Sequence, residues 1–233
     1  MRRATSRAIA AAASIGLTGC LSAPSEGGPA PADGDAAGVD ASSDGDVAPV
    51  TVDLLPTGLP STTALLGDQD GGSTYDLLCP PGRFVTGLDS AGSIFGLARL
   101  RATCSRLQIA VDGQTEVLDS VYTAPVGEDA DAEAIEPVDC SPGLIAVGYD
   151  GSLSENDVVT HLALNCAPVE WAPGPVMAEP SEATPELGQP DGFATGSGMC
   201  DPGWAAGGIA GQSGLLIDSF QLQCFQLEAR PAG

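Results

Sequence analysis

Cysteine, a residue that can ligate metals, attack substrates or form disulfides, occurs seven times in this chain of 233 residues. An odd number leaves one thiol outside any disulfide framework. Cys20 stands alone near the N-terminus, and the other six form three pairs in sequence: Cys79 and Cys104, Cys140 and Cys166, Cys200 and Cys224. The two groups need separate explanations, and the pairs point to an internal repeat.

The three pairs recur at nearly constant spacing. Their first members are 61 and 60 residues apart, and the separations within the pairs are 25, 26 and 24 residues. Six cysteines allow 15 connectivities, and the repeat symmetry favours a bond within each pair. Each bond closes a loop of the unfolded chain and should stabilise the fold by about 3 kcal/mol in the chain-entropy model. Such bonds require an oxidising compartment, which predicts an exported protein.

Each repeat also carries the same turn and strand signals. Cys-x-Pro-Gly occurs at 79–82, 140–143 and 200–203, and a further glycine follows eight residues after the first cysteine. Pro-Gly predicts a turn with positive φ at glycine, and the residues after it alternate as in a strand. The residues four and two before each second cysteine are apolar, so a strand carries that cysteine toward the core. We therefore predict an all-β fold of three antiparallel units.

Residues for catalysis or metal binding are sparse. His161 is the only histidine, with no acid or nucleophile in a known catalytic pattern near it, and we interpret it as an exposed strand residue. One histidine and six paired cysteines argue against zinc and copper, and no glycine-rich phosphate loop is present. We predict no metal and no cofactor.

Acidic runs are the nearest approach to a metal site. The run Glu128–Glu133 could supply oxygen ligands for calcium, but an EF-hand loop starting at Asp129 would need glycine and glutamate where Ala134 and Cys140 stand. A solvated loop is the better interpretation, and a looser calcium site stays open. The Asp-rich piece 40–46 is interpreted as solvating charge. A glycosidase needs two paired carboxylates, and the sequence nominates no pair among 31 acids.

The formal net charge of −23 excludes some partners. Lysine is absent, and three of the eight arginines lie within the first seven residues. So negative a surface repels phosphate, which argues against nucleic acid and anionic lipid headgroups.

The N-terminal segment predicts export and lipidation. A basic start is followed by an apolar stretch at 8–17, too short to span a bilayer, and then by Leu17-Thr18-Gly19-Cys20. This tetrapeptide resembles the bacterial lipobox, which implies cleavage after residue 19 and acyl chains on Cys20; an ordinary signal peptide is the alternative. Leu21 after the cysteine favours the outer membrane or cell surface. Residues 20–64, rich in Pro, Gly, Ala and Asp, are predicted to be a disordered linker.

The repeats resemble those of the vitelline membrane outer layer protein family. The middle copy is the most similar, with Cys140-Ser-Pro-Gly143, Val147-Gly148-Tyr149 and Leu164-Asn165-Cys166. The resemblance covers about residues 65–229 and implies a β-prism, three Greek-key sheets around a pseudo-threefold axis, as in jacalin-type lectins. We expect one domain at 65–230, with repeats at 65–125, 126–185 and 186–230.

These observations predict a membrane-anchored extracytoplasmic protein that binds carbohydrate without catalysis. Sugar binding would use an aromatic face, and Tyr149, Trp171 and Trp204 are the candidates by residue type. A core position is an equally good interpretation of Trp204. Two alternatives stay open: a carbohydrate-active enzyme for N-acetylated oligosaccharides, as the resemblance implies, and a purely structural envelope component.

Overall fold

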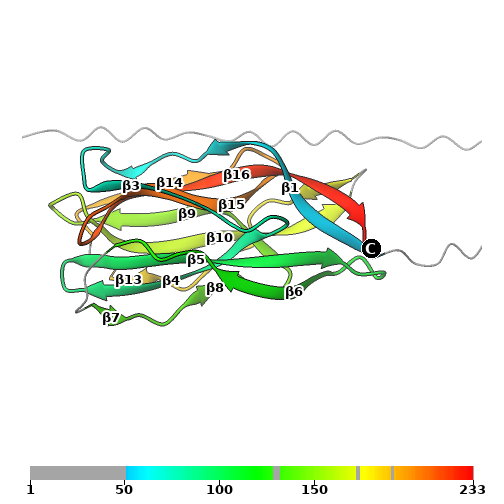
Figure 1. Ribbon diagram of the computed structural model, residues 1–233, viewed down its shortest axis with the longest axis horizontal. Coiled ribbons are helices and arrows are strands. Elements are labelled where there is room, and N and C mark those ends of the chain that lie inside the picture. The colour runs from blue at the N-terminus through cyan, green and yellow to red at the C-terminus, as the bar shows by residue number, and fades with distance from the viewer. Residues whose placement is uncertain (1–50, 128–131, 172–173, 190–191, 233) are drawn as a thin grey trace, which may run out of the picture. The chain divides into compact units, whose positions relative to one another are not determined.

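The computed structural model describes residues 51–127, 132–171, 174–189 and 192–232, whose regular structure consists of strands alone (Figure 1). The all-β prediction is therefore confirmed for this part of the chain. Within it, no helix is long and apolar enough to cross a membrane. The predicted signal peptide, Cys20 and most of the predicted linker lie outside the described residues.

Strands alternate with short turns throughout the described residues. In chain order they are β1 (Val52–Thr62), β2 (Leu66–Gly67), β3 (Ser73–Leu78), β4 (Phe84–Ser93), β5 (Gly96–Ile109), β6 (Thr115–Tyr122), β7 (Glu133–Ala134), β8 (Val138–Asp139), β9 (Leu144–Leu153), β10 (Val159–Trp171), β11 (Pro175–Met177), β12 (Glu182–Ala183), β13 (Leu187–Gly188), β14 (Ala194–Met199), β15 (Trp204–Ser213) and β16 (Ile217–Pro231).

Three hairpins, one from each repeat, form the centres of three sheets. Sheet I contains β15 and β16, flanked by β3 on one side and by β1 and β2 on the other. Sheet II contains β4 and β5, flanked by β7, β8 and β6. Sheet III contains β9 and β10, flanked by β14 and by β11 to β13. This is the predicted pseudo-threefold β-prism.

The flanking strands are exchanged between repeats. The strand that pairs with the first strand of each hairpin precedes the next hairpin in the chain: β8 flanks β4, β14 flanks β9, and β3 flanks β15. Sheet I is therefore closed by strands from both ends of the described chain. The first residues of β1 also pair with β5, which joins sheets I and II along one edge.

The folded unit begins earlier than the predicted linker boundary at residue 64. Strand β1 lies inside the predicted linker, and its Leu54 is completely buried. Pro56 and Pro60 would disfavour a central strand, but β1 tolerates them because it pairs with β5 only at Val52 and Asp53 and contains a bulge between Thr57 and Ser61. A proline at an edge or bulge removes no ladder hydrogen bond.

The Cys-x-Pro-Gly motif forms the predicted turn in each repeat. Gly82, Gly143 and Gly203 all have positive φ, between 78° and 85°. In the second and third copies the residue after the glycine donates its N–H to the carbonyl three residues earlier, at 3.0 and 2.9 Å, which closes a β-turn. The turn delivers the chain into the first strand of each hairpin.

A bulge in that first strand forms a backbone hydrogen bond with the next repeat. The register shifts at Thr86, Val147 and Gly207, seven residues after each first cysteine. The carbonyls of these three residues accept the backbone N–H of Cys140, Cys200 and Cys79, respectively, at 2.8 to 2.9 Å. The first cysteine of each repeat is thus bound to the sheet of the preceding hairpin.

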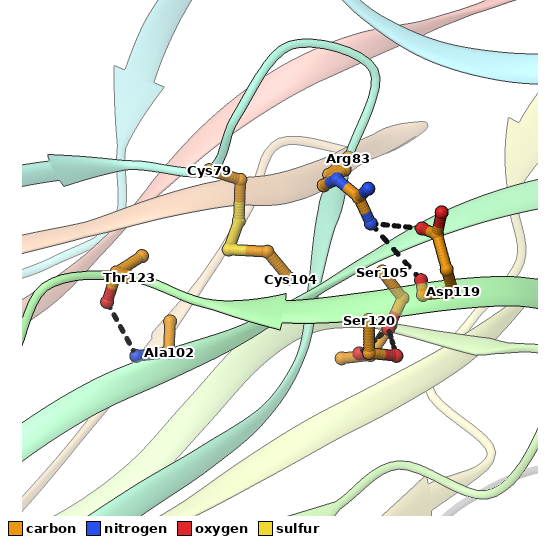
Figure 2. Close-up of a disulfide and its surroundings, with 9 residues drawn as sticks. Cys79, Arg83, Ala102, Cys104, Ser105, Asp119, Ser120 and Thr123 are labelled. Atoms are coloured by element: carbon orange, nitrogen blue, oxygen red, sulfur yellow. Dashed lines mark hydrogen bonds and ion pairs between the residues drawn. A yellow bond between two sulfur atoms is a disulfide. The ribbon is translucent and has the colours of Figure 1, made fainter.

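The disulfides consequently cross between sheets. Cys79 bonds to Cys104 (Figure 2), Cys140 to Cys166, and Cys200 to Cys224, which are the pairs favoured by the repeat spacing. Each first cysteine follows a flanking strand of one sheet, whereas each second cysteine lies in the hairpin of the next. The three bonds therefore join sheets I to II, II to III and III to I.

The core lies between the three sheets. The residues predicted to point inward are completely buried: Leu100, Ala102, Cys104, Leu162, Leu164, Cys166, Phe220, Leu222 and Cys224. They form one apolar cluster to which all three sheets contribute. A second cluster, around Phe84, Ile145 and Ala205, lies at the strand ends remote from the hairpin turns.

Candidate functional site

The three hairpin turns lie at the same end of the prism, which we call the hairpin end. Figure 1 shows the turns of β4–β5, β9–β10 and β15–β16 together at the left. Residues of all three turns, Phe95, Asn156 and Leu216 among them, line one hollow. Turns carried on paired strands are a common place for binding residues, because the sheets hold them in fixed positions.

Two adjoining hollows occupy the hairpin end, with volumes of about 570 and 770 Å³. They share Ile94, Phe95, Thr160 and Gln189. Their size is within the range of small-ligand sites in proteins.

Large apolar side chains project around these hollows. Phe95 is 68% exposed and Phe193 is 77% exposed, and both line the larger hollow. Ile94 and Leu215, on the turns of sheets II and I, are also largely exposed. Exposed aromatic rings gain nothing for the fold, and gathered exposed apolar groups mark interaction sites. An aromatic face can stack on the apolar face of a sugar ring.

Polar groups accompany the two rings. Asn156 and Gln189 provide amides that both donate and accept hydrogen bonds, and Glu133 and Glu155 provide carboxylate acceptors. Neither hollow is lined by a lysine or arginine. The hairpin end therefore offers hydrogen bonds to a ligand with hydroxyl donors and does not offer a cation to an anionic ligand.

A second polar feature of the hairpin end is the carboxylate of Asp218, just after the turn of sheet I. Partial burial raises the pKa of Asp218, and the nearby backbone N–H of Gly214 opposes this increase. A Cβ added to Gly71 would lie 2.6 Å from the Cβ of Asp218, and one added to Gly72 would lie 2.6 Å from the nitrogen of Gly214. The loop at 71–72 therefore packs closely against the turn that carries Asp218, and only glycine fits there.

Tyr149 does not lie at this site. Its side chain is completely buried, its O–H donates to the carbonyl of Ala64 at 2.7 Å, and its ring packs edge-on against Phe220. The aromatic position that follows the repeated glycine is therefore a core position. Its ring cannot stack on a sugar.

The two tryptophans lie away from the hairpin end. Trp171, 54% exposed, ends β10 and pairs with Pro175. Trp204 begins β15 and packs against the central core cluster, with its remaining surface facing a groove of about 220 Å³. Glu179 and Asp201 line that groove. The three aromatic residues selected by type are thus not brought together.

His161 has a serine and an acid near it but no accessible nucleophile. Its Nδ1 lies 3.3 Å from Oγ of Ser152, and its Nε2 lies 3.8 Å from Glu186. Ser152 is 1% exposed, its hydroxyl is 2.9 Å from that of Thr160, and Gly192 packs directly over it. A serine so covered cannot reach a substrate, so the group is structural. Contrary to the prediction, the His161 side chain is mostly buried, at 12% exposure.

Metal sites were predicted to be absent. In the described ranges, no group of three or more His, Cys, Asp or Glu side chains is arranged to hold an ion. Most of the acidic run at 128–133 and the whole Asp-rich piece at 40–46, the two stretches considered for calcium, lie outside those ranges.

Residue type alone did not identify the exposed phenylalanines or Asp218. Phe95 and Phe193 are two of five phenylalanines, and only their positions on turns separate them from core residues such as Phe84 and Phe220. The usable signal was an aromatic residue beside glycine between two strand patterns, as in Phe95-Gly96 and Gly192-Phe193.

Comparison with known proteins shows the fold. No family model and no curated protein matches the sequence. Among solved structures, the agglutinin of Calystegia sepium aligns with a TM-score of 0.50 and 16% identity, covering 72% of this chain and 97% of that chain. A mannose-binding jacalin-related lectin from Ananas comosus aligns with a TM-score of 0.46 and 14% identity (72% and 98%). Artocarpin, solved with methyl-α-mannose, has a TM-score of 0.49 and 11% identity (72% and 99%).

The resemblance to the vitelline membrane outer layer family thus finds no support from sequence matching, whereas its structural implication is confirmed. The chain has the β-prism fold of the lectin structures that it resembles.

Proposed function

We propose that this protein is an exported, membrane-anchored carbohydrate-binding protein without catalytic activity, and that it binds sugar at the hairpin end. The observation that carries the proposal is the hollow between the three hairpin turns, where the exposed rings of Phe95 and Phe193 stand beside amide and carboxylate groups. Stacking on a ring face and hydrogen bonding to hydroxyls are the two interactions that sugar recognition needs.

Two further observations support it. The carboxylate of Asp218, beside the glycines of the neighbouring loop, adds an acceptor at the same end. The solved structures with the same fold include lectins described with bound glycan or mannoside. Membrane anchoring rests on the sequence alone, on the lipobox-like segment ending in Cys20.

A glycan array, followed by calorimetry on the best ligand, tests the sugar-binding proposal. We expect binding without calcium, at least tenfold weaker in a Phe95→Ala/Phe193→Ala variant and in Asp218→Asn. Leu59→Ala is the matched control, because Leu59 is 86% exposed on β1 and lines none of the hollows described above. No binding to any glycan at millimolar concentration would refute the proposal, and turnover of chito-oligosaccharides would refute the non-catalytic assignment.

A further inference from the structure

The outer face of sheet I carries a groove of about 480 Å³ that shares no lining residue with the hairpin-end hollows. Side chains from β1, β3, β15 and β16 and from the loop after β2 line it. Four of its polar side chains are amides, those of Gln69, Gln212, Gln221 and Gln223, and the others are Thr62, Thr74, Tyr75, Asp76 and Ser219.

Sheets I and II differ at the cross-strand pair that lies in this groove. In sheet II, Asp89 lies ten residues after the first cysteine of its repeat, and Arg101 lies three residues before the second. These two residues pair across β4 and β5. The Arg101 side chain donates to Asp89 at 2.7 Å and lies 4.0 Å over the ring of Tyr122, so an ion pair and an aromatic ring cover that face. In sheet I the corresponding pair is Ala210 and Gln221. Ala210 and Gln221 both line the groove, and no ion pair among the described residues covers them.

Charge distinguishes this groove from the rest of the molecule. The chain has a net charge of −23, yet the groove contains one carboxylate, Asp76, which accepts a hydrogen bond from Gln223 at 2.7 Å. The described residues that line the groove include no lysine or arginine, so the groove gives an anionic ligand no counter-charge, and its single carboxylate is already bonded to Gln223. The amides of Gln69 and Gln221 each present a donor and an acceptor side by side, which matches neighbouring hydroxyls on a sugar. The side-chain N–H groups of Gln212 and Gln223 donate within the protein, to the backbone carbonyl of Gln69 and to Asp76.

The apolar content of the groove argues against a protein partner. Its apolar margin consists of Pro60, Leu65 and the half-exposed Leu78, while Tyr75, its aromatic lining residue, is 6% exposed and donates its O–H to Ser219. Protein interfaces are enriched in exposed aromatic and apolar anchors at their centres. A shallow amide-lined groove with a narrow apolar margin fits the hydroxyls and C–H faces of a sugar chain.

We propose that the outer face of sheet I is a second binding groove, for a neutral oligosaccharide chain, that acts independently of the hairpin end. The amides of Gln69 and Gln221 bind hydroxyl groups, and Leu78 contacts a ring face. A protein with two such sites can hold one long glycan at two places or bind two separate chains, and either arrangement strengthens attachment to a polymeric surface.

The sharpest variant transfers the ion pair of sheet II into sheet I. Ala210→Asp/Gln221→Arg places across β15 and β16 a pair that this protein already accommodates across β4 and β5, so we expect it to fold while filling the groove. Ala163→Arg, opposite Asp150 in sheet III, is the matched control, because it creates the same pair on another sheet face.

The readout combines calorimetry with side-chain amide NMR, using chitotetraose, cellotetraose and mannotriose as neutral probes on the full chain. We expect the Gln69 and Gln221 amide signals to shift with at least one probe, also in the Phe95→Ala/Phe193→Ala variant. The transferred ion pair should weaken this binding at least tenfold, and Ala163→Arg should leave it unchanged. Loss of all binding in the phenylalanine variant, or unchanged affinity with the transferred ion pair, would overturn the second site while leaving the hairpin end intact.

Discussion

Three buried threonines complete the backbone hydrogen bonding at equivalent places in the three sheets. The hydroxyls of Thr63, Thr123 and Thr184 accept the N–H of the residue two before each second cysteine, at 2.9 to 3.0 Å. Figure 2 shows the bond from Ala102 to Thr123. The flanking strand is interrupted at each site, and the hydroxyl replaces the missing carbonyl. Each threonine begins the pattern Thr-x-x-aliphatic-Gly, whose glycine has a φ of 87° to 96°.

Replacing one of these hydroxyls should leave a buried N–H without an acceptor. We expect Thr123→Val to lower the free energy of unfolding by about 1–3 kcal/mol, measured by urea denaturation. Thr123→Ser keeps the oxygen and loses one methyl group, so it should cost about 1 kcal/mol or less. Equal losses in the two variants would show that the hydroxyl is not the stabilising group.

Two buried tyrosines predict how stability depends on pH at the alkaline end. Burial, and secondarily the charge of Asp218, raises the pKa of Tyr75, and burial raises the pKa of Tyr149 to about 12. Because the fold favours the neutral phenols, their stabilisation is complete below the unfolded-state pKa of about 10. It is lost as the pH rises through the folded-state values.

The native protein should therefore resist phenol ionisation and unfold cooperatively above about pH 10. We expect the phenolate absorbance of Tyr75 and Tyr149 to appear together with loss of the β-sheet circular dichroism signal. Tyr149→Phe should lower stability at neutral pH by about 1 kcal/mol, because the carbonyl of Ala64 loses its donor. Ionisation of both phenols in the still-folded protein would contradict this assignment.

At the scale of elements, the repeated glycines and bulges determine how the strands are exchanged. Gly87, Gly148 and Gly208 lie opposite the residue that precedes the next first cysteine. A Cβ on any of them would come within 2.7 to 2.8 Å of a carbonyl oxygen on the flanking strand. Glycine is therefore required there by close backbone approach, since the flanking strand must lie near enough to place its cysteine for the disulfide.

The three disulfides should contribute similarly, because their loops are nearly equal. We expect each double variant, such as Cys140→Ala/Cys166→Ala, to lose about 3 kcal/mol of unfolding free energy, measured with guanidinium under oxidising conditions. Reduced wild-type protein should lose more than any single double variant. A variant as stable as wild type would mean that the corresponding sheet junction needs no covalent bond.

At the scale of the whole molecule, the first and last strands of the described unit pair with each other. β1 pairs with β16, and the N–H of Ala232 donates to the carbonyl of Thr51 at 3.0 Å. The β16 hairpin would otherwise present an unpaired edge strand, so the N-terminal strands also protect it. In our proposal this closed unit follows a lipid-anchored, acidic linker.

Cys20 provides the test of anchoring. Wild-type protein expressed in a Gram-negative host should partition into the detergent phase and incorporate labelled palmitate, because acyl chains on one residue hold a protein on a membrane. Cys20→Ala should appear in the soluble fraction and leave the three disulfides unchanged. A soluble, unlabelled wild-type protein would show that the segment is an ordinary signal peptide.

Much of the fold could be predicted from local sequence. Pro-Gly turns and the alternation toward Cys104, Cys166 and Cys224 are properties of neighbouring residues, and both appear in the structure. The even spacing of the cysteine pairs is counted along the whole chain, and the expected disulfides also appear. The boundary at residue 64 was wrong, because prolines argue against strands unless the strand lies at an edge. That condition depends on distant partners and is invisible in the segment itself.

The sequence by itself determined the threefold repeat, the cysteine pairs and the all-strand architecture, because periodicity and turn chemistry act over a few residues. Tertiary structure alone decided which sheet each flanking strand joins, since β8, β14 and β3 find their partners through bulges far away in the chain. It also decided which aromatic rings face solvent. Tyr149 lies in the core and Phe95 on a turn, because burial depends on packing between sheets and not on residue type.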